Sequence, residues 1–351
     1  MSNPFLKIMH RTIATSQPMY IIAEISANHN QNFQQAVKLI ETAKKIGADA
    51  VKLQTYTPDT ITLNSRKKYF MVGKGLLWKG KNLYDLYREA YTPWSWQPKL
   101  KKIADKLKIA LFSSPFDASA VDFLEKMNVP AYKIASFELV DLPLIEKVAR
   151  TRKPIIISTG MGTFHEIKKA VETVRKAGNH QIALLKCTSA YPAEPQEANL
   201  KTIPHMAASF LIPVGLSDHT LGSVVPLIAW ASGACIVEKH LTLSRRQQGP
   251  DSAFSMEPDE FKQMVDSLRT AETSMGKIHY GPTKSEKRAI RYRRSLFIVK
   301  DIKTGEKFTM ENIRSIRPAN GLRPKYLPAI LGKTASHAIK VGTPVTFRMV
   351  A

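Results

Sequence analysis

Two histidines stand 21 residues apart, and each follows shortly after a short apolar run. They are His219 and His240. In a chain that alternates strands with helices, this spacing corresponds to about one strand–helix repeat. Both imidazoles would then reach the same end of neighbouring parallel strands, where such folds keep their active sites. Two neutral imidazoles beside Asp218 and Glu238 indicate a site for a divalent metal.

Polar residues also follow the other apolar runs, and three of them are lysines: Lys52, Lys133 and Lys186. Lysine supplies a point charge and serine a compact donor, so these ends suit a substrate that carries phosphate and carboxylate. The alternative is that each lysine pairs with a neighbouring Glu or Asp, because an unpaired buried charge costs several kcal/mol. Three lysines at alternate strand ends favour the anion site.

Glu24 ends the first predicted strand, close to where the eighth must pair if the sheet closes. A carboxylate beside a metal site acts as a general base or holds a substrate hydroxyl. A structural ion pair with Lys239 is the alternative. His29 lies in an Asn-His-Asn setting that fits either a turn or a site.

The elements that must position these residues are apolar runs that alternate regularly with amphipathic segments. The runs are Tyr20–Ile25, Ala50–Leu53, Ile109–Phe112, Ala131–Ala135, Pro154–Ile157, Ile182–Leu185, Ile212–Leu216 and Ala234–Val237. Short buried strands between helical segments predict a parallel sheet. Eight units in roughly 250 residues predict a (β/α)8 barrel. An open doubly wound sheet is the runner-up, but the first strand lacks its usual glycine-rich turn.

The alternation of apolar runs and amphipathic segments is irregular in two places. Residues 57–94 form a long aromatic insert, which predicts either a lid or partner contact, or a packed excursion. After residue 280 a basic linker (281–294) precedes a small, turn-rich β domain (295–351), with strands expected at Ser295–Val299, Thr334–Ala338 and Val345–Phe347. A domain of about 60 residues is marginal alone, so we expect it to pack either on its own barrel or on a neighbouring subunit.

The formal charge is +23, and residues 276–351 carry 17 Lys or Arg against four Asp or Glu, a net +13. A basic tail fits a nucleic-acid or polysaccharide-binding protein, a solvated face, or a field that attracts polyanionic substrates. The two cysteines, Cys187 and Cys235, provide no disulfide framework and fit a reducing compartment. No run is long enough to span a bilayer. We expect a cytoplasmic chain without nucleic-acid or membrane partners.

Several short segments together resemble the sialic acid synthase family. They are Ala23–Asn30, Lys52–Gln54, Ser158–Met161, Cys187–Pro192, Gly215–Thr220, Glu238–His240 and Gly249–Asp251, and the tail segment Ile316–Gly321 resembles the family's antifreeze-like (SAF) domain. The resemblance covers nearly the whole chain and implies a TIM-barrel synthase domain (1–280) followed by an SAF domain. It implies a condensation of phosphoenolpyruvate with an N-acetylated amino sugar to a nine-carbon 2-keto acid, with release of phosphate. It also implies a domain-swapped homodimer.

The resemblance implies roles for individual residues. His219 and His240 would hold the metal, Mn²⁺ with Mg²⁺ or Co²⁺ as alternatives, and Glu24 would act at the sugar or at water. Residues expected at phosphoenolpyruvate are Lys52, Gln54, Ser114 and Lys133 for its carboxylate side and Ser136, Ser158, Ser189 and Ser217 for its phosphate. Residues expected at the sugar are Tyr191, Asp251 and, from the other subunit, Arg317.

Departures from the usual family pattern indicate a branch. Ser26 and Gln31 stand where relatives usually have glycine, and Ser189 where neuraminate synthases have asparagine. The segments Asp251–Ser255 and Ala135–Asp141 are most similar to the pseudaminic acid synthase branch. That branch would use a 2,4-diacetamido-2,4,6-trideoxy hexose, against whose methyl groups Phe137 and Phe254 either pack or serve as core. A neuraminate or legionaminate synthase is the enzymatic alternative, and a non-catalytic basic binding protein is the other.

Overall fold

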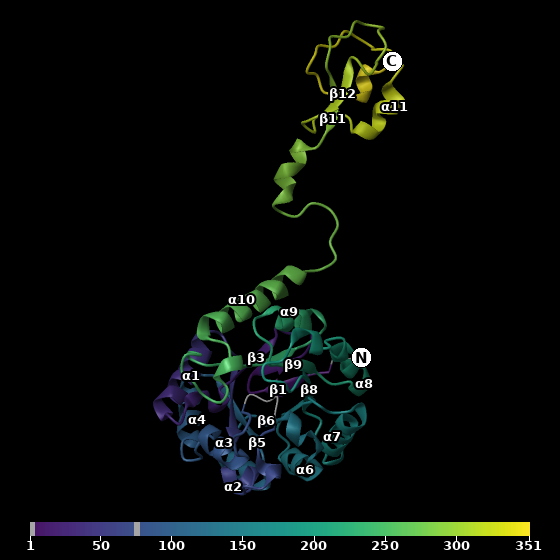
Figure 1. The fold of residues 1–351 in the computed structure, drawn as a ribbon. Coiled ribbons are helices and arrows are strands. Elements are labelled where there is room, and N and C mark those ends of the chain that lie inside the picture. The colour runs from purple at the N-terminus through teal and green to yellow at the C-terminus, as the bar shows by residue number, and fades with distance from the viewer. Residues whose placement is uncertain (1–3, 74–77) are drawn as a thin grey trace. The chain divides into compact units, whose positions relative to one another are not determined.

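Eight short apolar runs form parallel strands that close into a barrel in the described part of this computed structural model, residues 4–73 and 78–351 (Figure 1). The strands are β3 (Tyr20–Glu24), β4 (Ala50–Thr55), β5 (Ala110–Pro115), β6 (Tyr132–Ile134), β7 (Ile155–Ser158), β8 (Ile182–Cys187), β9 (Val214–Asp218) and β10 (Ile236–His240). Nearly every residue in them is buried, as expected for a sheet covered outside and filled inside. β10 pairs with β3 and closes the ring, which confirms the predicted barrel.

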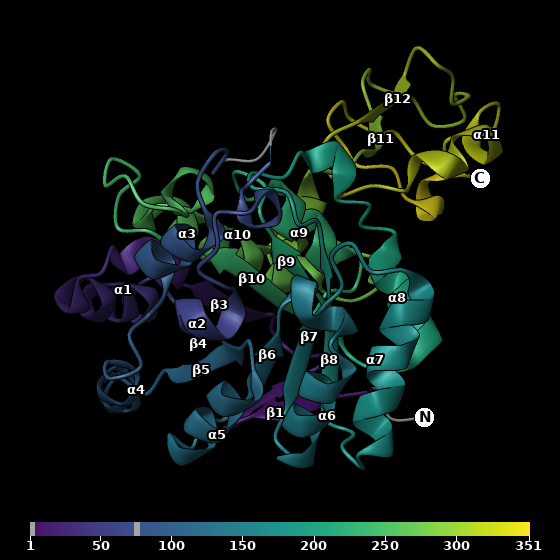
Figure 2. The same ribbon diagram turned by 60° about the horizontal axis from the view of Figure 1, so that its bottom comes forward.

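Amphipathic helices surround the strands on the outside of the barrel (Figures 1 and 2). They are α1 (Phe33–Lys45), α4 (Gln97–Lys106), α5 (Ala118–Lys126), α6 (Leu142–Arg150), α7 (Phe164–Lys176), α8 (Thr202–Phe210), α9 (Val224–Ala231) and α10 (Pro258–Met275). In α7, Ile167, Ala170, Val171 and Val174 are buried at the spacing of one helix face. Side chains start several of these helices: Thr163 begins α7 through a capping box with Glu166.

A hairpin that the sequence analysis did not predict precedes the barrel. Its strands are β1 (Leu6–Ile8) and β2 (Arg11–Ile13), which pair antiparallel. Leu6, Ile8 and Ile13 are buried in the same core as the barrel strands. Each strand has only three residues, too short for its alternation to stand out in the sequence.

The loops that follow the carboxyl ends of the strands carry short helices. They are η1 (Ser26–His29), α2 (Pro58–Ile61), η2 (Lys68–Phe70), α3 (Leu83–Ala90), η3 (Ser136–Val140), η4 (Pro195–Glu197) and η5 (Ser252–Phe254). The predicted aromatic insert comprises α2, η2 and α3, and its residues 74–77 lie outside the described part. Trp78 of the insert donates a hydrogen bond from Nε1 to the Pro250 carbonyl, 2.8 Å away. The insert therefore contacts a loop of the barrel.

The chain divides into two units between Gly276 and Lys277, and the second unit has a core of its own. Its elements are η6 (Glu286–Tyr292), β11 (Ser295–Ile298), β12 (Ile313–Ile316), η7 (Pro324–Tyr326), α11 (Leu327–Ile330) and η8 (Phe347–Met349). β11 pairs antiparallel with β12, which the sequence did not predict. The strands expected at Thr334–Ala338 and Val345–Phe347 are wrong: single bridges join Lys307 to Thr334 and Ala335 to Val350, because turns interrupt the pairing. Within the described residues, no helix has the length and apolarity to cross a membrane.

Candidate active site

Polar side chains gather where the barrel strands end, and the strand alternation sorts them into two groups. On β10, Glu238 forms an ion pair with Lys52, whereas Lys239 forms an ion pair with Asp218 of β9 at 2.5 Å. Adjacent residues of a strand point to opposite faces, so Lys239 and Asp218 form a pair on the other side of the sheet from Glu238. Asp218 is thus engaged away from the imidazoles, and the alternative ion pair between Glu24 and Lys239 is wrong.

Two carboxylates and two lysines alternate in a row inside the barrel, in the order Glu24, Lys52, Glu238 and Lys133. Lys52 Nζ lies 3.0 Å from Glu24 Oε2 and 2.6 Å from Glu238 Oε1, and Lys133 Nζ lies 3.7 Å from Glu238 Oε1. All four side chains are at most 5% exposed. Lys186 is not part of this row, because its Nζ donates to its own neighbour's carbonyl, that of Cys187. Of the three predicted lysines, two share one anionic partner.

Burial and mutual attraction set the pKa values in this row. Burial raises the pKa of Glu24 despite the nearby Lys52. The two lysines outweigh burial at Glu238 and lower its pKa. Burial lowers the pKa of Lys133 to about 8, against the pull of Glu238. Glu24 is therefore the carboxyl group in the row whose proton is most easily exchanged near neutral pH.

Two further predicted residues, Gln54 and Ser114, lie beside this row on β4 and β5. Gln54 Nε2 is 3.4 Å from Glu24 Oε1, and Ser114 is the direct neighbour of Gln54 across the two strands. Ser114 Oγ is buried and has no hydrogen-bond partner among the described residues. A buried hydroxyl without a partner is available to a ligand.

A cradle of hydroxyl groups lies at the ends of β6, β7 and β8. Lys133 Nζ donates to Ser158 Oγ at 2.6 Å, and the backbone N–H of Gly160 donates to Ser136 Oγ at 3.1 Å. A Cβ at Gly160 would overlap Ser189 Oγ and lie 2.7 Å from Ser136 Oγ. Small groups with donors and an adjacent ammonium group match the needs of a phosphate. Ser217 lies farther along the rim, 3.5 Å from Glu238 Oε1.

The two imidazoles meet as the spacing predicts. The ring centroids of His219 and His240 are 5.4 Å apart. His219 Nδ1 is 2.9 Å from the Thr188 carbonyl, which assigns a proton to Nδ1, so Nε2 is the nitrogen that would bind a metal. His240 Nδ1 is buried without a hydrogen-bond partner in residues 4–73 and 78–351. Burial and the neighbouring cations hold the pKa of His240 far below its usual value, so its imidazole is neutral.

The donor set fits an open divalent metal site. Neutral imidazoles are common ligands of such metals, and an unpaired buried nitrogen needs a partner. No group of three His, Cys, Asp or Glu side chains is arranged to hold a metal within the described residues. The two histidines would thus supply two ligands and leave the other positions to substrate and water.

Aromatic and acidic residues expected at the sugar lie next to the imidazoles. The Tyr191 ring centroid is 4.4 Å from that of His219. Phe254 is 2% exposed and packs edge-on against His240, with centroids 4.9 Å apart. Asp251 begins the same short segment, and burial raises the pKa of its carboxyl group. Phe254 therefore walls the site, whereas Phe137 is 60% exposed on η3 and is not a core residue.

Trp78 of the insert borders this part of the site, with its ring 5.9 Å from Tyr191. Both a lid and a packed excursion make such a contact, so the choice between them stays a prediction. Arg317 lies in the second unit, directly after β12, and is exposed. The structure describes that unit by itself, so the role of Arg317 at the sugar stays a prediction.

Three residues differ from what the sequence suggested or add to it. Glu138 received no role, yet burial raises its pKa to about 7 and its Oε2 has no partner in the described part. Cys187 is also part of the site: burial opposes ionisation, but the His219 side chain lowers the pKa of its thiol to about 6. His29 is buried 3.0 Å from Thr92 Oγ1 and is structural. Their positions at strand ends were visible, but their surroundings were not.

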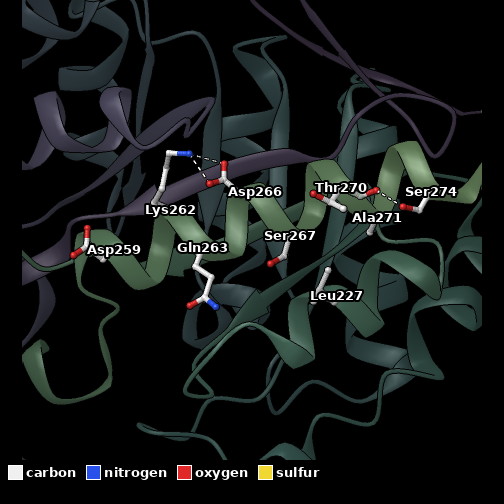
Figure 3. A pocket seen from close by; sticks show the side chains of 9 residues that line it. All are labelled: Leu227, Asp259, Lys262, Gln263, Asp266, Ser267, Thr270, Ala271 and Ser274. Carbon is white, nitrogen blue, oxygen red and sulfur yellow. Dashed lines mark hydrogen bonds and ion pairs between the residues drawn. The ribbon is translucent and has the colours of Figure 1, made fainter.

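A separate hollow lies on the outer helices α9 and α10 (Figure 3). Leu227 contributes to it from α9, and the rest of the wall comes from α10. Its Lys262 and Asp266 neutralise each other at 2.6 Å. Since it contains none of the strand-end residues, we assign the chemistry to the barrel mouth and not to this hollow.

The sequence matches the NeuB family over residues 39–280 and an SAF domain over residues 293–351. The chain belongs to the NeuB family. Among its relatives, this NeuB-family chain is 47% identical to the pseudaminic acid synthase of Helicobacter pylori, over 94% of this chain and 97% of that one. It is 36% identical to the N,N'-diacetyllegionaminic acid synthase of Legionella pneumophila, over 94% of each chain.

Solved structures show the same architecture. The N-acetylneuraminic acid synthetase of Leptospira borgpetersenii, crystallised with citrate, is similar to this NeuB-family chain with a TM-score of 0.72 and 30% identity. The similarity covers 82% of this chain and 95% of that one. Barrel and family membership therefore rest on independent comparisons of sequence and structure.

Proposed function

We propose that this chain is a pseudaminic acid synthase. It condenses phosphoenolpyruvate with 2,4-diacetamido-2,4,6-trideoxy-β-L-altropyranose to a nine-carbon 2-keto acid and releases phosphate. The observation that carries the proposal is the higher identity, over nearly the full length, to a pseudaminic than to a legionaminic acid synthase. The apolar wall that Phe254 forms beside the imidazoles supports it, because this sugar presents a methyl group in place of a hydroxyl.

In this proposal the alternating row and the cradle bind phosphoenolpyruvate. Lys52 and Lys133 bind its carboxylate, with Gln54 and Ser114 as hydrogen-bonding neighbours. Its phosphate lies in the cradle of Ser136, Ser158 and Ser189, with Ser217 at the rim. Glu238 holds the two lysines in place before the substrate arrives, so little reorganisation is needed on binding.

The sugar lies toward His219 and His240, in contact with Tyr191 and Asp251. A divalent metal held by the two imidazoles, Mn²⁺ with Mg²⁺ or Co²⁺ as alternatives, would supply a Lewis acid for the aldehyde oxygen of the open-chain sugar. Glu24, with its raised pKa, exchanges the proton that the reaction moves at the sugar or at the attacking water.

The bonds change in a defined order. C3 of phosphoenolpyruvate attacks the aldehyde carbon and forms the new carbon–carbon bond, while the carbonyl π bond breaks, its oxygen takes up a proton to become a hydroxyl, and positive charge develops at C2. Water adds to C2 and gives up a proton. The carbon–oxygen bond to phosphate then breaks as the C2 hydroxyl passes its proton to the departing phosphate, which leaves the 2-keto acid. The lysines and hydroxyls position the reactants and balance the charge of the departing phosphate.

The proposal includes a domain-swapped homodimer in the cytoplasm. The small second unit of one subunit covers the barrel of the other, and Arg317 reaches the N-acetyl group of the sugar there. The support is that a unit of this size has a small core, and that its strong positive charge suits an anionic substrate. Two buried, unpaired cysteines fit a reducing compartment.

The test supplies the purified chain with phosphoenolpyruvate, Mn²⁺ and one sugar at a time: the trideoxy sugar, its legionaminate-type isomer, or N-acetylmannosamine. Released phosphate is measured, with His219→Ala as the inactive control. We expect the fastest turnover with the trideoxy altropyranose sugar. Faster turnover of N-acetylmannosamine or of the isomer would assign the chain to the corresponding synthase. Salt-sensitive binding to nucleic acid without any turnover would identify a basic binding protein.

A further inference from the structure

Ser26, the second residue after strand β3, has an unusual backbone conformation. Its φ is +36°, in the left-handed region that residues with a Cβ seldom adopt. The residue is 3% exposed, so neighbouring structure holds it in place. Such a conformation costs of order 1 kcal/mol, and it persists where the surrounding contacts require it.

The Ser26 hydroxyl donates a short hydrogen bond to Asp251 Oδ2, across 225 residues of sequence. The backbone N–H of Ala27 donates to the same oxygen at 3.3 Å. Both bonds therefore fall on Oδ2, and neither uses Oδ1. An aspartate held by one oxygen presents the other in a fixed direction, as an acceptor for a hydroxyl or amide N–H of a ligand.

The turn after β3 also forms hydrogen bonds to the rest of the segment 251–255, which Asp251 begins. Asn28 Nδ2 donates to Ser255 Oγ at 2.8 Å, and Ser255 Oγ donates to the Asp251 carbonyl at 2.6 Å. Between these two ends lies Phe254, which packs on His240. The turn after β3 thus fixes both ends of a segment whose middle lines the site.

We infer that Ser26 is a positioning residue that orients Asp251 toward the amino sugar and thereby sets sugar affinity. The inference rests on the proposed function, in which Asp251 contacts the sugar. The hydroxyl lies on Asp251 in a turn that holds Ser26 at a positive φ. Phosphoenolpyruvate binds to other residues, so its affinity does not depend on this contact.

The test compares Ser26→Gly with Asp251→Asn and the double variant. Ser26→Gly removes the hydroxyl and relieves the backbone strain, so we expect a melting temperature equal to or above that of the wild type. We expect the KM for the sugar to rise about tenfold or more, as for a lost hydrogen bond to a charged group, with the KM for phosphoenolpyruvate unchanged. The double variant is expected to be no weaker than Asp251→Asn alone.

A matched control is Lys108→Gly, which relieves a φ of +53° at an exposed residue after α4. It tests the release of strain alone and is expected to leave both KM values unchanged. An unchanged sugar KM in Ser26→Gly, or additive losses with Asp251→Asn, would overturn the inference. If the wild type turns over none of the sugars, the proposed function is refuted. A crystal structure of Ser26→Gly still tests the positioning role in that case. We expect Oδ2 to leave the Ala27 N–H, and an unmoved carboxylate would contradict us.

Discussion

Gly160→Ala tests the phosphate cradle most directly, because it adds a single methyl group to it. The new Cβ would overlap Ser189 Oγ and lie 2.7 Å from Ser136 Oγ, so both hydroxyls must turn away. Each is expected to contribute about 1.5–3 kcal/mol as a donor to a charged ligand. Their joint loss weakens phosphoenolpyruvate binding by about 3–6 kcal/mol, or roughly 10²- to 10⁴-fold.

The fold should tolerate the same change. The atoms in the way are the ends of two small side chains, and Gly160 has no positive φ. We therefore expect the free energy of unfolding to change by no more than about 1 kcal/mol. Calorimetric binding of phosphoenolpyruvate and the melting temperature measure the two effects separately.

The matched control is Gly73→Ala, also free of a positive φ, where an added Cβ meets none of the described atoms within 4 Å. It should change neither phosphoenolpyruvate affinity nor stability. A Gly160→Ala protein that binds phosphoenolpyruvate within threefold of the wild type would refute the assignment of the cradle.

Three other outcomes are expected. His219→Ala and His240→Ala should each abolish turnover and the retention of Mn²⁺ on gel filtration, measured by elemental analysis, with a melting temperature near that of the wild type; turnover by a chelated variant would contradict this. Lys133 must be charged to bind a carboxylate, and its pKa is about 8, so kcat/KM for phosphoenolpyruvate should fall about tenfold per unit above pH 8; a flat profile to pH 10 would speak against it. Asp218→Asn removes one partner of a buried ion pair and should cost about 3–5 kcal/mol by thermal melting, whereas Asp266→Asn, in an exposed pair, should cost less than about 1 kcal/mol.

The barrel was predictable because each strand is a short run of apolar, β-branched residues between amphipathic segments. The meeting of His219 and His240 followed from the same periodicity. The first hairpin and β12 were missed because strands of three or four residues carry too little pattern. The second unit relies on turns and single bridges, which leave almost no periodic signal.

The site was predictable in outline but not in its pairings. Residues at a strand end were taken to face one site, although strand alternation sends Glu238 and Lys239 to opposite faces. Applied to β9 and β10, that alternation would have paired Asp218 with Lys239. The link from Ser26 to Asp251 had no such signal, because it joins two loops across 225 residues of sequence.

The alternating row of Glu24, Lys52, Glu238 and Lys133 is electrically balanced, with two carboxylates and two ammonium groups. Phosphoenolpyruvate brings further negative charge into this interior, where solvent does little to screen it. Glu24, already inclined to hold a proton, is the group that relieves the excess. Formation of the complex should therefore draw hydrogen ions from the medium, and its measured heat should vary with the ionisation enthalpy of the buffer.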